Sequence, residues 1–344
     1  MKAAVINKFG GPEVLELMEL PTPVPAPGQV LIKVLAATVN RLDHYIREGS
    51  VNPALSFPHV LGMDAAGEIA GLGQGVTGFK TGDRVIAMPG YAKDPADAAI
   101  RPATAAPSYS LPGLHLTGTY AQYITVPAAW VVHDSSGLPP EQSVSLPVTL
   151  LTAVRAVQIV GEVKAGQTVL VHAGASSTGL MSIQVAKALG AKVATTVRTQ
   201  ESADVVKALG VDLLINTKDE DFNEAITRWT NGAGVDVAID SIGGDGFGNT
   251  LAAVKPFGIV VAMGFMAGTE VKFDIRNFFF SQKQIRGTLM ADIEDLQYWL
   301  EQVRAGVIKT VVDTVLPLSE AAKAHELVAT NKAKGAVVLM PWAY

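Results

Sequence analysis

The chain has 344 residues, of which 49% are hydrophobic and 17% charged, with a formal net charge of -5 and no cysteine. The length suits two domains, and the apolar content excludes disorder as the main state. The negative charge argues against a nucleic-acid partner. The lack of cysteine excludes disulfides, thiolate catalysis and cysteine-bound metals.

The N-terminus opens on an apolar run, residues 1–6, that has the pattern of a strand. It lacks the apolar core and small-residue cleavage site of a signal peptide. No apolar run looks long enough to cross a bilayer, so we expect a cytoplasmic protein without a membrane partner.

Residues 1–130 are rich in glycine, proline and short β-like runs, such as 31–36 and 67–71, which indicates an antiparallel β domain. Residues 89–118 differ, because they are rich in alanine, proline and serine without a clear period. We expect a long surface excursion there, either bound down or mobile.

From residue 168 onward, apolar strands alternate with helices at 180–189 and 201–209, which end at Gly190 and Gly210. The six predicted strands are 168–173, 192–197, 213–216, 235–240, 258–263 and 285–290. This alternation predicts an α/β fold with a doubly wound parallel sheet.

The tail predicts two helices, 292–305 and 320–330, and a final strand, 336–340, that rejoins the first domain. The expected division is therefore 1–130 with 291–344 for one domain, and 131–290 for a dinucleotide-binding domain.

The turn after the first parallel strand contains Gly174, Ser176, Ser177, Thr178 and Gly179 and opens a helix. A pyrophosphate needs close backbone approach, free N–H groups and the positive end of a helix. The two glycines meet the first and last of these needs, and the serine hydroxyls can bond a phosphate. An ordinary glycine–serine turn is the alternative, but the strand–turn–helix context favours a dinucleotide site.

The end of the second parallel strand indicates which dinucleotide binds. NAD enzymes usually place a carboxylate there for the ribose 2′-hydroxyl, whereas this chain has Thr196 and then Arg198. A cation and a hydroxyl suit a 2′-phosphate, so the sequence favours NADPH. The alternative is that Arg198 is a solvated surface residue.

Several segments together resemble the medium-chain dehydrogenase/reductase superfamily, and most closely its zinc-free quinone oxidoreductase branch. The segments are 40–49 (NRLDHYIREG), 61–68 (LGMDAAGE), 82–85 (GDRV), 146–153 (LPVTLLTA) and 240–244 (DSIGG). The resemblance implies a GroES-like β domain plus a Rossmann domain. It also implies hydride transfer from NADPH to a quinone or an α,β-unsaturated carbonyl.

The same resemblance assigns the site residues. Tyr45 stands at the position of the proton-relay histidine of zinc-dependent members, and Asn40 can orient the nicotinamide or the acceptor oxygen. A core tyrosine and a turn asparagine are the alternatives. The implied cofactor-binding residues are Thr152, Gly174, Ser176, Ser177, Thr178, Gly179, Thr196, Arg198, Ser241, Gly264 and Phe265.

The positions that match the zinc ligands of other members are Asn40, Met63 and Val148. A thioether and an alkyl group cannot replace imidazole and thiolate, so no metal is expected. Without a Lewis acid, the favoured acceptors are those whose hydride adduct is a stabilised anion. Asp43 and Arg47 are interpreted as structural charges paired with each other, and Asp64 as a buried structural acid.

Two other functions remain open from the sequence: an enoyl-thioester (enoyl-CoA or enoyl-ACP) reductase, and a crystallin-like protein that binds NADPH without turnover. The resemblance also implies a homodimer. Residues 271–275 have the alternating pattern of an exposed strand, which predicts pairing with a second copy at a sheet edge.

Overall fold

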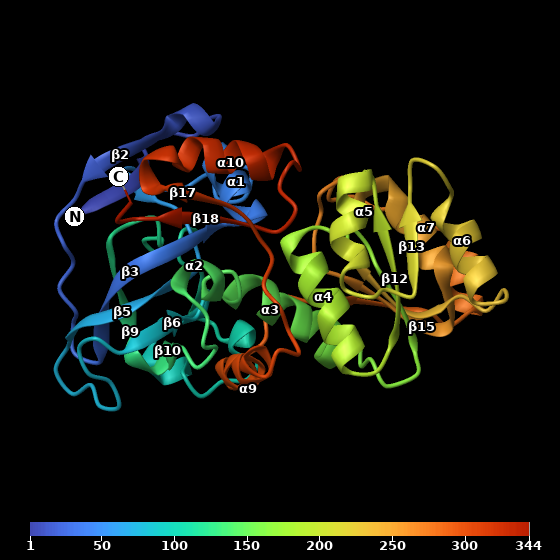
Figure 1. The fold of residues 1–344 in the computed structure, drawn as a ribbon, viewed down its shortest axis with the longest axis horizontal. Coiled ribbons are helices and arrows are strands. Elements are labelled where there is room, and N and C mark those ends of the chain that lie inside the picture. Colours follow the sequence, from blue (N-terminus) through green and yellow to red (C-terminus); the bar gives the residue numbers. More distant parts are fainter. Residues whose placement is uncertain (344) are drawn as a thin grey trace. The chain divides into compact units, whose positions relative to one another are not determined.

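The computed structural model describes residues 1–343, which divide into two compact units (Figure 1). The first unit takes in Met1–Val148, Asp292–Gly306 and the chain from Thr310 onward. The second takes in Thr149–Ala291 and Val307–Lys309. The boundary falls inside one helix, α3 (Pro147–Val154), which continues into a π-helical turn at Arg155–Val160.

A mixed, mainly antiparallel sheet forms the centre of the first unit, in the order β10-β6-β5-β3-β18-β17 with β9 also paired to β3. In β3, buried and partly exposed side chains alternate, as expected of a strand with one face on the core. The strands are β3 (Gln29–Val39), β5 (Ala65–Leu72), β6 (Arg84–Ala87), β9 (Tyr123–Pro127), β10 (Val131–His133), β17 (Val312–Pro317) and β18 (Ala336–Met340).

A second, three-stranded sheet of this unit has the order β2-β1-β4, from β1 (Lys2–Ile6), β2 (Leu15–Glu19) and β4 (His59–Val60). The predicted return of the last strand is confirmed, because β18 pairs antiparallel with β3. The helices of this unit are α1 (Arg41–Glu48), α2 (Pro140–Ser143), α9 (Ile293–Arg304) and α10 (Ala321–Ala329).

The excursion at residues 89–118 is bound down. It contains the paired strands β7 (Tyr91–Ala92) and β8 (Tyr109–Ser110). Arg101 donates two hydrogen bonds to the carboxylate of Glu294 on α9, and the N–H of Ala103 donates to Asp292. The segment is therefore attached to the start of α9.

The second unit contains a six-stranded parallel sheet in the order β13-β12-β11-β14-β15-β16, the strand order of a Rossmann fold. The strands are β11 (Thr168–Val171), β12 (Lys192–Val197), β13 (Leu213–Asn216), β14 (Val235–Asp240), β15 (Val254–Ala262) and β16 (Gln284–Gly287). The chain order reverses between β11 and β14, so their carboxyl ends define the crevice in which such sheets bind ligands.

The helices of the second unit are α4 (Ser177–Ala188), α5 (Gln200–Lys207), α6 (Phe222–Trp229), α7 (Phe247–Ala253) and α8 (Ile275–Phe280). The predicted helix at 180–189 begins earlier, because Ser176 caps it. The predicted strand at 271–275 is wrong: residues 271–274 are irregular and Ile275 begins α8. The outer strand on this side of the sheet is β16 instead.

One helical stretch, Pro140–Val160, is long and apolar enough to meet a length criterion for crossing a membrane, contrary to our reading of the sequence. Its most apolar window is 67% buried within the protein, as in a core helix. Length and composition alone are weak evidence for a membrane span.

Candidate active site

The phosphate turn after β11 is shaped by close backbone packing. A Cβ on Gly174 would lie 2.1 Å from the Thr195 hydroxyl oxygen, and one on Gly179 would lie 2.4 Å from the carbonyl oxygen of Ala173. Ala173 itself has a φ of +52°. The turn therefore requires glycine at both positions, whether or not a ligand binds.

Helix α4 presents its positive end beside this turn. The Ser176 hydroxyl accepts a hydrogen bond of 3.1 Å from the N–H of Gly179 and so caps the helix. Its own O–H hydrogen is still available to a phosphate oxygen. Ser177 and Thr178 form the first turn of α4, where backbone N–H groups have no carbonyl partner within the helix. This arrangement fits a pyrophosphate.

The two strand-end residues differ in role. Thr196 is buried, and its hydroxyl oxygen accepts a hydrogen bond of 3.1 Å from the N–H of Ala173, so it supports the turn from within. Arg198 directly follows β12 and is exposed. Within residues 1–343 no hydrogen bond or ion pair involves its guanidinium group. A free cation at this place fits an anionic substituent on the ribose.

The loop after β14 carries an unsatisfied polar atom. The hydroxyl oxygen of Ser241 is buried and has no hydrogen-bond partner among residues 1–343. A Cβ on Gly264 would lie 2.5 Å from the carbonyl oxygen of Ser241, so that glycine lets the loop after β15 pack closely. Phe265 is 40% exposed. An orphaned hydroxyl at the carboxyl edge of the sheet fits a polar ligand group.

Thr152 lies on α3 and is partly buried. Buried His172 follows β11 and is hydrogen-bonded to the hydroxyl groups of Thr196 and Thr250. Burial lowers the pKa of the His172 imidazole, while the nearby charge of Asp240 opposes that shift. This histidine is consequently neutral at physiological pH.

In the first unit, buried Asp64 orients Asn40. The Asp64 carboxylate accepts hydrogen bonds from the Asn40 side-chain amide at 2.7 Å, the N–H of Val148 at 2.9 Å and the hydroxyl of Thr38. Burial raises the pKa of Asp64 to about 6, against the opposing effect of these donors. The interpretation of Asp64 as a buried structural acid is confirmed.

Asp43 is also fully buried but is not paired with Arg47. Its carboxylate accepts hydrogen bonds from the N–H of Asn40 at 2.8 Å, the N–H of Gly62 at 3.1 Å and the Tyr120 hydroxyl at 3.0 Å. Burial raises the pKa of Asp43 to about 7. The expected Asp43–Arg47 pair is therefore wrong, since backbone and phenol donors already surround the carboxylate.

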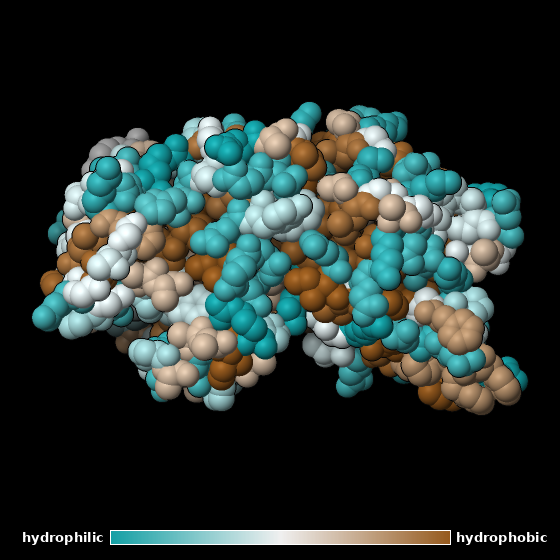
Figure 2. All heavy atoms as spheres, turned by 90° about the horizontal axis from the view of Figure 1, so that it is seen from below, coloured by the Kyte–Doolittle hydropathy of each residue, from teal (hydrophilic) through white to brown (hydrophobic). Residues whose placement is uncertain are grey.

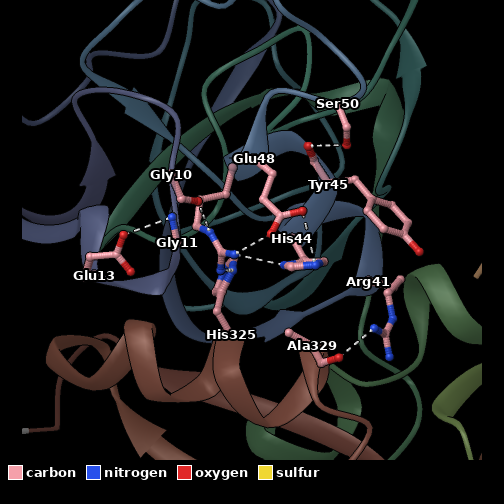
Figure 3. A network of polar contacts seen from close by, with 11 residues as sticks. Gly10, Gly11, Glu13, Arg41, His44, Tyr45, Glu48, Ser50, His325 and Ala329 are labelled. Carbon is pink, nitrogen blue, oxygen red and sulfur yellow. Dashed lines mark hydrogen bonds and ion pairs between the residues drawn. The ribbon is translucent and has the colours of Figure 1, made fainter.

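Arg47 instead takes part in a separate polar network, whose members Gly10, His44, Glu48 and His325 are labelled in Figure 3. Its guanidinium donates to the carbonyl oxygen of Gly10 at 3.0 Å and contacts the imidazoles of His325 at 3.1 Å and His44 at 2.9 Å. Glu48 lies 3.5 Å away and provides the opposite charge. Burial, with the charge of Arg47, holds the pKa of His325 well below its usual range.

Tyr45 lies on α1, one turn beyond Asn40. Its ring is partly buried and packs beside the His44 ring at a centroid distance of 5.5 Å. Figure 3 shows its hydroxyl directed away from His44 and His325. The start and middle of α1 therefore carry both proposed catalytic side chains, Asn40 and Tyr45.

The residues at the three zinc-ligand positions do not form a donor set for zinc. Met63 is buried, Val148 contributes only a backbone N–H, and the Asn40 amide nitrogen is bound to Asp64. Throughout the described chain, no group of three or more histidine, aspartate or glutamate side chains is placed to hold a metal ion. The residues present do not fit the metal.

Several polar residues of these networks were not predicted as site residues: Thr38 and Tyr120 beside the buried aspartates, His325 beside Arg47, and Thr250 beside His172. Thr250 lies on α7, a helix that the sequence pattern did not reveal. A usable signal existed near the strand ends, where His172 follows β11, Thr196 lies one residue before the end of β12 and Asp240 ends β14. The carboxyl ends of parallel strands meet at one edge, so these side chains had to approach one another.

Comparisons with known proteins agree with this architecture. Residues 26–139 match the family model of the alcohol dehydrogenase GroES-like domain, and residues 177–305 match that of the zinc-binding dehydrogenases. A 2-haloacrylate reductase from Burkholderia sp is 31% identical, with 99% of each chain covered. A quinone oxidoreductase from Pseudomonas aeruginosa is 30% identical, with 97% of each chain covered.

Solved structures are similar over almost the whole chain. An NAD-dependent alcohol dehydrogenase superposes with a TM-score of 0.93 at 34% identity, covering 99% of both chains. A mycobacterial protein complexed with NADPH superposes with a TM-score of 0.82 at 28% identity, covering 99% of this chain and all of the other.

The fold and its nucleotide edge are those of an oxidoreductase that uses a pyridine nucleotide. The chain belongs to the medium-chain dehydrogenase/reductase superfamily, and relatives named quinone oxidoreductase match it over nearly its full length. The predicted α/β fold, with a GroES-like domain and a Rossmann domain, is confirmed.

Proposed function

We propose that this protein transfers hydride from NADPH to a quinone or to an alkene conjugated to a carbonyl, without zinc. The proposal depends chiefly on one observation: the ligand positions of zinc-dependent members hold Asn40, Met63 and Val148, and the Asn40 amide is bound to Asp64. Without zinc, no Lewis acid is available to polarise an isolated carbonyl group. Acceptors whose reduced form is a stabilised anion need only orientation and a hydrogen-bond donor.

NADPH supplies the hydride when bound. In this proposal the dinucleotide-binding domain, expected from the sequence at residues 131–290, holds the dinucleotide through the second unit: the turn from Gly174 to Gly179 and the start of α4 face the pyrophosphate. Ser241, Gly264, Phe265 and Thr152 lie toward the nicotinamide half. The first unit, with 1–130 and 291–344 as its expected bounds, provides the acceptor side through Asn40 and Tyr45.

The preference for NADPH over NADH depends on Arg198. It is exposed, and no carboxylate occupies the end of β12 to hold a free 2′-hydroxyl. Similar structures include both an NAD-dependent enzyme and an NADPH complex, so the overall fold does not choose between the cofactors. The local charge favours the phosphorylated one.

The relatives' names support the acceptor class. One is named for quinones, and another for 2-haloacrylate, an alkene conjugated to a carboxylate. An enoyl-thioester reductase is the second candidate, since its acceptor is also a conjugated alkene. A protein that binds NADPH without turnover is the third.

A substrate panel separates these functions. NADPH oxidation is measured with quinones, enones and enoyl-CoA, with and without a metal chelator. We expect turnover with quinones or enones that survives chelation. Faster turnover of enoyl-CoA than of any quinone or enone would favour the second candidate. Binding of NADPH without turnover would favour the third, and one essential zinc per chain would contradict the proposal.

Tyr45→Phe tests the proton donor in the same assay. If the phenol donates to the acceptor oxygen, kcat for an enone should fall by about a hundred-fold, and less for a quinone, whose reduced anion is less basic. Tyr298→Phe is a suitable control because Tyr298 is 57% exposed on α9. Equal slowing of both acceptors would instead give Tyr45 a structural role.

We also propose that the protein is a homodimer, through the side of the second unit where β16 is the outer strand. Exposed apolar side chains occur within residues 266–289, the stretch that leads into β16 and just beyond it, and Figure 2 shows apolar surface among the polar residues. They include Met266, Val271, Ile275, Phe279, Phe280, Ile285 and Leu289. A bare strand edge beside apolar surface favours association with a second copy. Sedimentation of a monomer at high micromolar concentration would contradict this proposal.

We also expect the protein in the cytoplasm, and cell fractionation would test that location.

A further inference from the structure

Four buried polar side chains form a chain of hydrogen bonds beneath the carboxyl edge of the second unit's sheet. They come from four elements or their ends: Thr196 from β12, His172 after β11, Thr250 from α7 and Asp240 from β14. Each is no more than 3% exposed. Buried polar groups are costly unless paired, so each hydrogen must be accounted for.

The donor and acceptor of each hydrogen bond can be assigned by starting from Asp240, whose carboxylate can only accept. One oxygen of its carboxylate accepts hydrogen bonds from the N–H groups of Ile242 at 2.7 Å and Gly243 at 2.9 Å. The other accepts the hydroxyl hydrogen of Thr250 at 2.7 Å. Because Thr250 has only one hydroxyl hydrogen, its oxygen can only accept at the contact of 3.0 Å with Nε2 of His172.

The tautomer of His172 follows. Nε2 carries the hydrogen, so in the neutral ring Nδ1 is an acceptor and receives the Thr196 hydroxyl at 3.2 Å. The Thr196 oxygen in turn accepts from the N–H of Ala173. The rings of His172 and Phe222 pack in a T-shaped arrangement at a centroid distance of 5.0 Å, so one side of the imidazole has an apolar neighbour.

The two ends of this chain hold two different loops. At one end Thr196 binds the phosphate turn twice, because its carbonyl oxygen also accepts from the N–H of Gly174 at 3.0 Å. At the other end Asp240 fixes the backbone just after Ser241, whose hydroxyl is buried without a partner among residues 1–343. Among these four hydrogen-bonded side chains, His172 has the only ring, and this ring spans the gap between the hydroxyls of Thr196 and Thr250.

We propose that His172 is a positioning residue for the dinucleotide: as a neutral, Nε2-protonated imidazole it holds the phosphate turn and the Ser241 loop in one fixed arrangement. This inference rests on the proposed binding of NADPH at this edge. Loops that are ordered before the ligand arrives bind it more tightly, because less conformational freedom is lost on binding.

The protein offers a matched pair of threonine variants, one within this series of hydrogen bonds and one outside it. Thr250→Val removes the hydroxyl that links His172 to Asp240 on β14. Thr168→Val removes a similar hydroxyl at the other end of the sheet, where Thr168 donates to Asp236 of β14 at 2.9 Å. Both lose a threonine–aspartate hydrogen bond, but only the first lies in the proposed positioning chain.

The affinity for NADPH is measured by fluorescence titration, with thermal unfolding of each variant as a check on folding. Thr250→Val and His172→Gln should each raise the Kd by about ten-fold, as when a supporting partner of a binding site is lost. Thr168→Val should lower stability and leave the Kd within about two-fold. Folded Thr250→Val with wild-type affinity would overturn the inference, whereas failure of the wild type to bind NADPH would refute the proposed function first.

Nuclear magnetic resonance of the ¹⁵N-labelled wild type gives a second readout that needs no variant and no cofactor. His172 should show a protonated Nε2 and a bare Nδ1 throughout the pH range in which the protein is folded. The opposite tautomer, or a doubly protonated ring near neutral pH, would overturn the inference even if His172→Gln failed to fold.

Discussion

The buried polar residues of the two units differ in kind. Those of the first unit include Asp43, Asp64 and Arg47, each surrounded by donors or acceptors. Those at the carboxyl edge of the second unit are a neutral imidazole and two hydroxyls that end on a single carboxylate, Asp240. Charges inside a protein are costly when a partner is lost. We therefore expect changes to the buried charges of the first unit to act mainly on stability, and changes at the carboxyl edge of the second unit to act on ligand affinity as well.

The largest expected effect is on Arg47. Arg47→Met keeps much of the side-chain volume but leaves the carbonyl of Gly10 and two histidine nitrogens without their donor. Breaking a buried charged network of this kind costs about 3 kcal/mol of unfolding free energy. Chemical denaturation measures the loss. Arg304→Met is the control, because Arg304 is 64% exposed in its ion pair with Glu301 and should cost less than about 1 kcal/mol. Equal losses would show that burial of Arg47 matters little.

Acid should act on the two units in opposite directions. The raised pKa values of Asp43 and Asp64 mean that the folded state binds a proton more readily than the unfolded chain. Their contribution to stability is present at low pH and is lost as the pH rises to about 7. His172 has a lowered pKa, so its contribution is present above the unfolded value of about 6.5 and is lost as the pH falls.

Substitutions separate these two slopes. Between about pH 5 and 6, Asp43→Asn should make the slope of unfolding free energy against pH more positive, by up to about 1.4 kcal/mol per pH unit. His172→Gln should make it more negative by a similar amount. Hydrogen exchange can follow each unit separately. Slopes that shift in the same direction would contradict the contrast between the two units.

The third effect concerns ligand affinity. Arg198→Ala should weaken NADPH binding by about ten-fold and leave NADH nearly unchanged, because one charge-assisted contact to the 2′-phosphate is lost. Lys192→Ala, at the start of the same strand and also exposed, is the matched control. Isothermal titration gives both affinities. Equal wild-type affinities for NADPH and NADH would show that Arg198 is a solvated surface residue.

The sequence was sufficient for the features that depend on local pattern. Apolar strands ending at glycine-bounded turns predicted the parallel sheet. The predicted strand at 336–340 lies beyond the six strands of that sheet, so it was expected to rejoin the first domain. It was insufficient for residues 271–275. Val271, Phe273 and Ile275 alternate as in a strand, yet Asp274 caps α8 by accepting from the N–H groups of Arg276 and Asn277. The helix cap that Asp274 forms therefore outweighed the alternation of apolar residues that had predicted a strand.

The polar networks were harder to predict because they join residues far apart in sequence. Asp43 and Arg47 are one turn apart on α1, which made a pair reasonable. Their actual partners, Tyr120 and His325, come from segments 77 and 278 residues away. No local pattern gives such contacts, although both α1 residues were correctly expected to be structural charges.

The smallest expected effect lies at the amino end of the second unit's sheet, away from its proposed ligand edge. Phe257 has a φ of +62° and lies where β15 bulges out of register with β14. A left-handed backbone costs a residue with a β-carbon about 1–2 kcal/mol, whereas glycine adopts it freely. The Phe257 side chain is 63% exposed, so it contributes little packing in return.

Phe257→Gly should therefore stabilise the protein by about 0.5–1 kcal/mol, the relief of strain less the extra unfolded-state entropy of glycine. Phe257→Ala is the decisive control: it removes the ring but keeps the β-carbon, so it should give no gain. Stabilisation by alanine equal to that by glycine would show that exposure of the ring, and not the backbone, is the source of the cost. Either variant should leave NADPH affinity unchanged, because the bulge in β15 and the phosphate turn after β11 lie at opposite ends of the parallel sheet. A changed affinity would mean that strain at the amino end of the sheet reaches the ligand edge. Residues along the whole sheet of the second unit, and not only those at its carboxyl edge, would then influence ligand affinity.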